Sequence, residues 1–327
     1  MNINEIACRA GVSRATVSRY LNNGYVSQEK RELIGRIIEE TGYVPSHRGQ
    51  QLRTGKTRLV GVIIPKINSQ SVSRMVAGIT NVLTENNYHA VLANTENQID
   101  RELEFIELFA GRNHVDGIIL IATVLTQKHL QVLSGLSIPI VILAQHLPGY
   151  SCVYHNDYQA LYDITSLVLA KAKQPAFLGV LEQDEAAGKE RHRGFVDACK
   201  DAGLVALPEA QQVVGFDADS GYFGAERILD RVPDVDTIVC ATDEIAFGAM
   251  MCMHEYGRRV PDEVQITGAG DSLLSRIARP SLTTVHLYFK TSGSRAAQLL
   301  LAKMQGTSSD PCEIRMGYDI YSRMSMR

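Results

Sequence analysis

The sequence predicts an all-α N-terminal head followed by a larger α/β body, and two observations support this division. Residues 2–42 carry apolar side chains at helical spacing, whereas from Leu59 onward continuous apolar runs alternate with amphipathic stretches. Charge changes at the same place, because residues 1–58 hold ten Lys/Arg and five Asp/Glu while residues 59–327 hold 23 and 31. The net charge of −3 therefore combines a basic N-terminal segment with an acidic body, and the basic segment is a candidate for polyanion contact.

Composition excludes several classes of protein. Hydrophobic residues make up 45% and charged residues 21% of the 327 residues, as in ordinary soluble globular proteins. No apolar run reaches the roughly 18 residues of a membrane span, and the first residues lack the basic and apolar regions of a signal peptide. The six cysteines are far apart and form no CxxC pair, which favours reduced thiols in the cytoplasm over disulfides or a zinc site.

Three short helices are predicted in the head. Asn2 and Glu5 have the spacing of a capping box at the start of the first helix. Ser13 can cap the second helix, which runs from Arg14 to about Asn22, and Ser27 can cap the third. Gly11, between the first two helices, allows a tight turn.

The second helix carries side chains that suit the reading of DNA bases. Arg14 and Ser18 are four residues apart, as are Ala15 and Arg19, so these four make one outer face. Arg can pair bidentately with guanine, and Ala can contact a thymine methyl group. From spacing alone, a solvated face on a small helical bundle is an equally good interpretation.

Residues 3–22, with the pattern IA..AGVS..TVSR.LN, resemble the helix-turn-helix of the LacI/GalR family of bacterial transcription regulators. The resemblance implies that the second helix is a recognition helix lying in the major groove of operator DNA. The residues it assigns to DNA are the base readers Arg14, Ala15 and Arg19, and the backbone contacts Ser13, Thr16, Ser18 and Asn22.

Residues 45–58 resemble the hinge of the same family, which becomes a short helix on operator DNA. Leu52 matches the leucine that enters the minor groove and kinks the duplex, at an unstacking cost on the order of a few kcal/mol per step. The family usually has Ala-Arg where this chain has Gly49 and Gln50. Since glycine in a helix costs about 1 kcal/mol relative to alanine, we expect a hinge helix that is weaker without DNA. A basic solvated linker is the alternative.

Continuous apolar runs in the body predict buried parallel strands at 59–65, 89–93, 117–121, 140–143, 176–180 and 237–241. Amphipathic stretches between them predict helices at 72–86, 101–112, 158–171, 191–202, 220–231 and 245–257. This alternation predicts doubly wound α/β units.

The resemblance to the LacI/GalR family continues through the body and covers nearly the whole chain. Matching segments are 115–119, 193–195, 241–248, 260–264 and 280–285. The resemblance implies a periplasmic-binding-protein-like fold, in which two α/β subdomains are joined by three crossings around a cleft. The domains it implies are a DNA-binding domain at 1–44, a hinge at 45–58, and an effector-binding and dimerisation domain at 59–327. Within the last, the N-subdomain would be about 59–157 with 289–311, and the C-subdomain about 158–288 with 312–327.

Open α/β sheets bind ligands at the carboxyl ends of their strands, where such a cleft lies. Arg191 matches the family's ligand-binding arginine, whose five donors suit sugar hydroxyls or an anion, and Phe289 matches an aromatic position that packs on the ligand. Three positions depart from the family, with Thr242 in place of Asn and Gly270 and Ala144 in place of Asp. The residues expected to contact the effector are Asn68, Ser69, Ser71, Gln145, Arg191, Thr242, Asp243, Asp271 and Phe289.

The function that follows is that of a cytoplasmic, nucleoid-associated homodimeric repressor, which binds a pseudo-palindromic operator and is released by a sugar or sugar phosphate. Residues 267–272 and 288–293 are most similar to regulators of sucrose or related disaccharide use. We expect no cofactor, no metal and no membrane partner.

Two other classes of protein are alternatives to this function. An α/β enzyme with a basic arm lacks support, because no P-loop, GxSxG or HExxH pattern occurs and Leu273 stands where GxGxxG needs its last glycine. A sugar-binding transport protein is disfavoured by the missing signal peptide and by the DNA-binding head.

Overall fold

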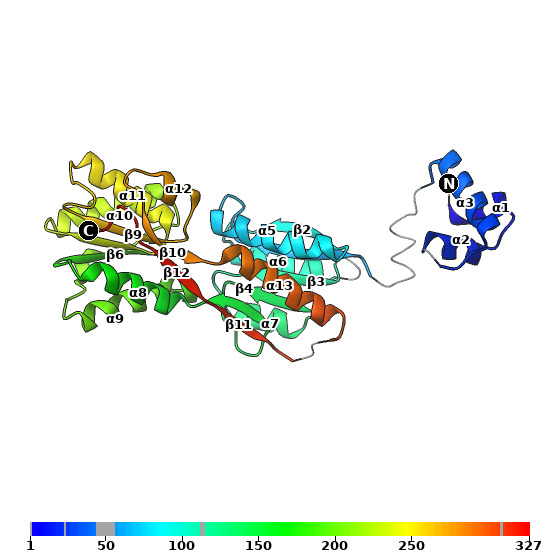
Figure 1. Ribbon diagram of the computed structural model, residues 1–327. Coiled ribbons are helices and arrows are strands. Elements are labelled where there is room, and N and C mark those ends of the chain that lie inside the picture. Colours follow the sequence, from blue (N-terminus) through cyan, green and yellow to red (C-terminus); the bar gives the residue numbers. More distant parts are fainter. Residues whose placement is uncertain (1, 23, 44–55, 112–114, 308–309) are drawn as a thin grey trace. The chain divides into compact units, whose positions relative to one another are not determined.

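The computed structural model describes residues 2–22, 24–43, 56–111, 115–307 and 310–327 (Figure 1). The chain divides into two compact units, Met1–Thr57 and Arg58–Arg327. Among the described residues, no helix has both the length and the apolar character to cross a membrane.

Three helices are found in the described part of the first unit, as the sequence predicts. They are α1 (Ile3–Arg9), α2 (Arg14–Leu21) and α3 (Gln28–Thr41). One apolar side chain from each helix is fully buried where the three meet, namely Ile6, Val17 and Ile34. This small core holds α2 by one face and leaves the opposite face to solvent.

The helix caps of the head agree with the sequence in two of three cases. Asn2 and Glu5 form the predicted capping box at α1, and the Ser13 hydroxyl accepts a hydrogen bond of 3.2 Å from a backbone amide in the first turn of α2. The third prediction is wrong in one respect, because Ser27 stands at the start of α3 but its side chain makes no capping hydrogen bond. Gly42 ends α3 with φ of 59°, a left-handed conformation that glycine adopts without strain.

Two six-stranded sheets form the second unit, and each belongs to one lobe. The N-lobe sheet has the order β11 (Glu313–Met316), β5 (Cys152–His155), β4 (Ile140–Leu143), β3 (Gly117–Ile121), β1 (Leu59–Ile64) and β2 (His89–Asn94). The C-lobe sheet has the order β12 (Tyr318–Tyr321), β10 (Thr283–Leu287), β9 (Gln265–Ala269), β8 (Thr237–Cys240), β6 (Pro175–Gly179) and β7 (Gln211–Val213). The strands pair in parallel except for β10 with β12. All six predicted strands are present, although β2 is mostly exposed and not buried as predicted.

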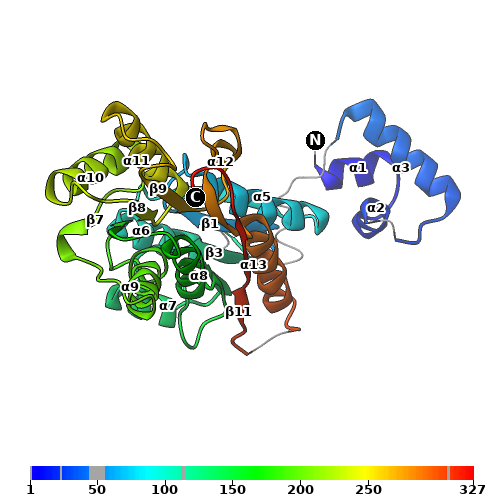
Figure 2. The same cartoon turned by 60° about the vertical axis from the view of Figure 1, so that its left-hand side comes forward.

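Helices cover both sheets, as expected for doubly wound α/β units. Those of the N-lobe are α5 (Gln70–Glu85), α6 (Ile99–Ala110), α7 (Gln127–Ser134) and α13 (Phe289–Met304). Those of the C-lobe are α8 (Asp157–Leu169), the π-helical turn η1 (Glu185–Glu190), α9 (Arg191–Asp201), the 3-10 turn η2 (Pro208–Ala210), α10 (Ala218–Arg231), α11 (Asp243–Glu255) and α12 (Leu273–Ile277). In both views α8 and α9 lie next to each other on the C-lobe (Figures 1 and 2).

Two N-lobe helices that are far apart in the sequence, α5 and α13, pack side by side (Figure 1). Glycine makes this approach possible, because a Cβ atom on Gly293 would lie 2.0 Å from the backbone oxygen of Met75. A Cβ atom on Gly78 would lie 1.9 Å from the backbone oxygen of Lys290. The close packing of α5 against α13 fixes the first turns of both helices, which border the cavity described below.

The chain passes between the lobes three times, before α8, before α13 and between β11 and β12. The third crossing corrects the sequence prediction, which assigned 312–327 to the C-subdomain. Strand β11 instead pairs in parallel with β5, with Glu313 opposite Cys152, and so belongs to the N-lobe. Its side chains alternate between exposed and half-buried, so the strand has no continuous apolar run by which to recognise it.

Candidate functional site

The residues predicted to contact DNA in the head lie on or beside α2. The side chains of Arg14, Ala15 and Arg19 are exposed, whereas Val17 is fully buried against the other two helices. Helical periodicity therefore directs the three proposed base readers to solvent on one side of α2. Ser18 is half-buried on the same helix.

The predicted backbone-contacting residues also hold the ends of α2. The hydroxyls of Ser13 and Thr16 lie 3.0 Å apart and form a hydrogen bond at its start. At its end, the side-chain amide of Asn22 donates to the backbone oxygen of Ser18. These side chains thus orient the helix that carries Arg14 and Arg19. Leu52, the predicted minor-groove residue, lies outside the described residues.

A cavity of about 460 Å³ lies in the second unit. Its wall includes residues that directly follow β1, β3 and β4 of the N-lobe and β8 and β9 of the C-lobe. It therefore lies at the carboxyl ends of strands from both sheets, the usual place for ligands in open α/β folds. The predicted effector residues that line it are Asn68, Ser69, Ser71, Gln145, Arg191, Thr242, Asp243 and Phe289.

Arg191 is fixed in the cavity wall by an ion pair. It is 6% exposed, and its Nε and Nη2 atoms donate to one oxygen of Asp157 at 2.8 and 2.6 Å. Its Nη1 atom donates to the backbone oxygen of Ala241 at 2.5 Å. Since Asp157 begins α8 and Ala241 follows β8, the guanidinium joins two elements and cannot swing freely.

Gln145 of the N-lobe and Asp184 of the C-lobe join the two lobes beside the cavity. The side-chain amide of Gln145 donates to the Asp184 carboxylate at 2.7 Å. The same carboxylate oxygen accepts from the backbone amide of Ala187 at 2.9 Å and so caps η1. Burial raises the pKa of Asp184, an effect that these two hydrogen bonds partly oppose.

Thr242 and Asp243 stand where β8 leads into α11. The Thr242 hydroxyl caps α11. The Asp243 carboxylate accepts a hydrogen bond of 2.7 Å from the backbone amide of Ser272 and one of 2.5 Å from the Thr284 hydroxyl. Burial raises the pKa of Asp243. Both residues thus line the cavity and also hold its C-lobe wall together.

Asp271 does not line the cavity, which corrects its prediction as an effector contact. Its side chain is fully buried and binds Arg276 at 2.7 Å, Arg323 at 2.5 Å and His286 at 2.8 Å. Gly270 and Asp271 have φ of 147° and 46°, and this local turn directs the carboxylate toward the basic cluster. The sequence shows that Asp271 is next to position 270, where the family has an Asp. It does not show in which direction the Asp271 side chain points.

Family comparisons identify both units of the chain. Residues 2–46 match the model described as "Bacterial regulatory proteins, lacI family", and residues 164–326 match "Periplasmic binding protein-like domain". The "Sucrose operon repressor" of Staphylococcus xylosus is 35% identical over 311 residues, which cover 93% of this chain and 94% of that protein. The chain belongs to the lacI family of bacterial regulatory proteins.

Solved structures agree with this assignment. A "transcriptional regulator CelR-cellobiose complex" is 27% identical to this lacI-family regulator, with a TM-score of 0.77 and coverage of 99% of each chain. The lac repressor dimer bound to operator and an anti-inducer is 22% identical, with a TM-score of 0.91 and coverage of 99% and 98%. The second likeness shows that the fold is shared. The fold prediction is therefore confirmed, and the relatives are transcription regulators rather than enzymes.

Several cavity residues of this lacI-family regulator were missed from the sequence. Arg74 donates to the backbone oxygen of Gly270 at 2.6 Å, and its guanidinium lies 5.3 Å from the centre of the Phe289 ring. The other missed polar residues include Lys66, His155, Asp157, Asp184, Asp217 and Glu244. Lys66 lies between β1 and the predicted residues Asn68, Ser69 and Ser71. Its place just after a strand could therefore have identified it as a cavity residue. Glu244 directly follows the predicted Asp243 and carried a similar signal, whereas the remaining residues come from elements that meet only in the fold.

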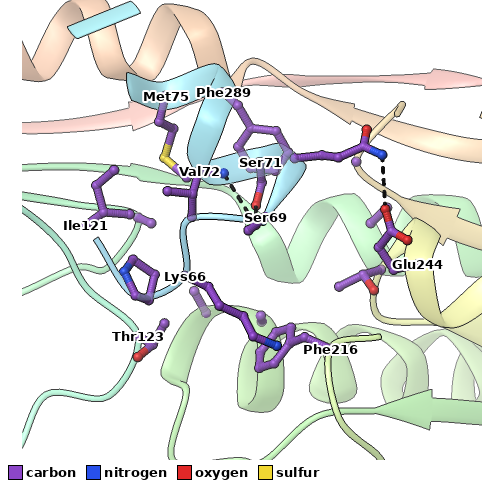
Figure 3. A pocket seen from close by; sticks show the side chains of 18 of the residues that line it. Lys66, Ser69, Ser71, Val72, Met75, Ile121, Thr123, Phe216, Glu244 and Phe289 are labelled. Atoms are coloured by element: carbon purple, nitrogen blue, oxygen red, sulfur yellow. Dashed lines mark hydrogen bonds between the residues drawn. The ribbon is translucent and has the colours of Figure 1, made fainter. Parts of the chain in front are cut away.

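Apolar side chains form one part of the wall. Figure 3 shows Val72, Met75, Ile121 and Phe289 grouped together, with Lys66 extending toward Phe216 elsewhere in the wall. The side-chain amide of Gln70 in the N-lobe donates to the carboxylate of Glu244 in the C-lobe at 3.2 Å. The cavity thus combines apolar surface with polar groups from both lobes, as small-molecule sites do.

Proposed function

We propose that this lacI-family regulator represses a carbohydrate-utilisation operon and that a sugar bound in the cavity releases it from operator DNA. The observation that carries the proposal is the presence, in one chain, of a helix-turn-helix with exposed arginines and of a polar cavity built by two lobes. The names of two relatives, a sucrose operon repressor and a regulator in complex with cellobiose, support a sugar as the ligand.

On the DNA, Arg14, Ala15 and Arg19 read base edges in the major groove, and the side chains at the ends of α2 set its register on the backbone. Leu52 enters the minor groove at the operator centre and bends the duplex. Two heads are needed, because each offers only a small interface. A homodimer that pairs through its bodies supplies the second head at high effective concentration and matches a pseudo-palindromic operator.

In the cavity, the eight predicted residues that line it contact the sugar, with Arg191 as a fixed donor and Phe289 as an apolar surface. A sugar touching both lobes favours one arrangement of the lobes over another, and only this difference in affinity can alter operator binding. The regulator acts on the nucleoid in the cytoplasm, and the sugar leaves the cavity chemically unchanged.

Operator titration tests this proposal. Fluorescence anisotropy of a labelled operator duplex is measured with the full-length protein, alone and with saturating sucrose or cellobiose. We expect at least one sugar to weaken operator binding, and chromatography of the same mixture to recover it intact. Tighter operator binding with sugar would show co-repression instead, and conversion of the sugar would show an enzyme.

A further inference from the structure

The wall of the cavity that we propose as the effector site carries more acidic than basic side chains. Among the described residues, its wall holds five carboxylates, those of Asp157, Asp184, Asp217, Asp243 and Glu244. It holds three permanent cations, those of Lys66, Arg74 and Arg191. The acidic groups therefore outnumber the basic ones, and a ligand carrying a phosphate or carboxylate would add a further negative charge.

The two arginines of the wall already have partners. Arg191 binds Asp157 and a backbone oxygen. Arg74 donates to the backbone oxygens of Gly270 and Asp271 at 2.6 and 3.3 Å and lies over the Phe289 ring. These bonds already use part of the hydrogen-bonding capacity of each guanidinium and offset part of its charge, which lowers the net gain from binding an anion.

Lys66 is the third cation, and its charge acts on Asp217. Hydrogen bonds from the backbone and side chain of Ser220 lower the pKa of Asp217, and the positive charge of Lys66 lowers it further. Asp217 is therefore ionised at neutral pH and offsets the charge of Lys66 toward a ligand. No cation in the described part of the wall is left without a nearby acidic or carbonyl partner.

The carboxylates would resist an anion further. Burial raises the pKa of Asp184, Asp243 and Glu244, which means that the wall disfavours the negative charges it already carries. A phosphate placed among them would add repulsion in a partly buried site, where screening by salt is weak. A hydroxyl group, in contrast, can donate to these same oxygens without adding charge.

In the described part of the wall, His155 is the residue whose buried side chain has a nitrogen or oxygen atom without a hydrogen-bond partner. The residue is 5% exposed, and its Nε2 atom has no hydrogen bond among the described residues. Its ring lies edge-on to Phe289, with 5.1 Å between ring centres. Burial lowers the pKa of His155 to about 4, so the imidazole is neutral at pH 7 and adds no cation. Leaving such an atom unpaired is unfavourable, and a ligand that forms a hydrogen bond with it would remove that cost.

We propose that the cavity selects an uncharged, hydroxyl-rich ligand over its phosphorylated or acidic counterparts, and that Nε2 of His155 forms a hydrogen bond with one of the ligand's hydroxyls. This inference rests on the proposed function of the cavity as the effector site. It narrows the ligand from a sugar or sugar phosphate to the free sugar. It also assigns a specificity role to a side chain that the sequence did not single out.

Calorimetric titration of the full-length protein with matched pairs tests the selectivity. The probes are sucrose and sucrose 6-phosphate, glucose and glucose 6-phosphate, and glucose and gluconate. In every pair that binds, the uncharged member should bind about tenfold tighter or more. Tighter binding of the charged member would overturn the inference and leave the proposed sugar response intact. If no probe bound and none shifted operator affinity, the proposed function would fail with it.

Asp217→Asn tests the electrostatic argument directly. Asn caps helices as well as Asp does, so α10 keeps its N-terminal cap while the wall loses one negative charge beside Lys66. The variant should shift the ratio of the two affinities several-fold in favour of the charged probe. An unchanged ratio of the two affinities would contradict the charge argument.

Two substitutions at His155 test the hydrogen bond. His155→Phe keeps a ring but removes the nitrogen and should weaken the uncharged ligand about fivefold to tenfold, while His155→Gln should restore part of the affinity. His146→Phe is the control, because that histidine lies outside the cavity wall and bonds Glu313. Operator affinity without ligand checks that each variant is folded. Equal ligand affinity in wild type and both His155 variants would refute the contact.

Discussion

The side-chain amide of Gln145 donates a 2.7 Å hydrogen bond to Asp184, and the two residues belong to different lobes of the same cavity. Further polar links between the lobes come from Gln70, which bonds Glu244, and from Arg74, which bonds the backbone of Gly270. A ligand that touches both lobes binds more tightly when the lobes are already aligned, because less order has to be imposed on binding.

Gln145→Ala should therefore weaken sugar binding about fivefold to tenfold, which corresponds to the loss of about 1 kcal/mol from one hydrogen bond. Calorimetry with the sugar that binds best measures the change. Gln212→Ala serves as a control, since that side chain bonds only within the C-lobe and lies outside the cavity. Equal losses in both variants would assign the effect to general destabilisation instead.

The two serines at helix starts in the head allow a matched comparison of caps. The Ser13 hydroxyl accepts from the backbone amide of Thr16 at 3.2 Å, whereas Ser27 makes no capping bond. Ser13→Ala should destabilise α2 by about 1 kcal/mol and raise hydrogen exchange of its amides. Ser27→Ala should change exchange in α3 little. Identical behaviour of the two variants in the full-length protein would show that the Ser13 cap contributes nothing.

Arg19→Ala should weaken operator binding by about 1–3 kcal/mol and relax the choice of base at one position. The physical reason is that an exposed arginine on the outer face of α2 can bond two acceptors of one guanine at once. Arg36→Ala on α3 is the control, and should change affinity similarly for all sequences if at all. The measurement is anisotropy against a set of operators that each differ at one base pair. A uniform loss for Arg19→Ala would remove Arg19 from the base readers.

Buried strands interrupted by polar residues or glycine, such as β9 and β10, were not predicted from the sequence, whereas strands that read as continuous apolar runs could be predicted. Leu59–Ile64 is such a strand and is found where expected. Strand β11 is half-exposed at the sheet edge, so its pattern carries no run and its lobe was assigned wrongly. The pattern of apolar residues along a short edge strand does not indicate which of two sheets the strand joins.

The cavity could be predicted only in part, for a related reason. Resemblance places Arg191 and Phe289 at a cleft, and both line the cavity. It cannot show that Asp157 binds the guanidinium of Arg191, because these residues are brought together only by the packing of α8 and α9. Nor can it show that two left-handed residues turn the Asp271 carboxylate away from the cavity. Such side-chain directions depend on tertiary contacts.

Because Asp271 binds basic side chains outside the cavity wall, replacing it should affect stability much more than sugar binding. Asp271→Asn leaves Arg323 and Arg276 without their carboxylate, and should lower the free energy of unfolding by about 2–4 kcal/mol. Sugar affinity at a temperature where the variant is folded should stay within a few-fold of the wild type. Urea denaturation and calorimetry on one preparation measure both. A large loss of affinity with normal stability would return Asp271 to the effector contacts.

The titration of His155 should be visible in the pH dependence of the free energy of unfolding. Burial lowers its pKa to about 4, with Asp157 raising it and Arg191 lowering it further, while an unfolded histidine has a pKa of about 6.5. Between these values the unfolded chain binds more protons, so stability falls as the pH drops from about 6.5 to 4, by about 3 kcal/mol from this group.

His155→Phe removes that titration and leaves the carboxylates in place. Urea unfolding of the two proteins between pH 7 and pH 4 should therefore show the wild type losing about 3 kcal/mol more than the variant. Above pH 7 the difference between them should be constant, since His155 is neutral in both the folded and the unfolded state there. Parallel curves over the whole range would mean that the His155 imidazole is not held in its neutral form by the fold.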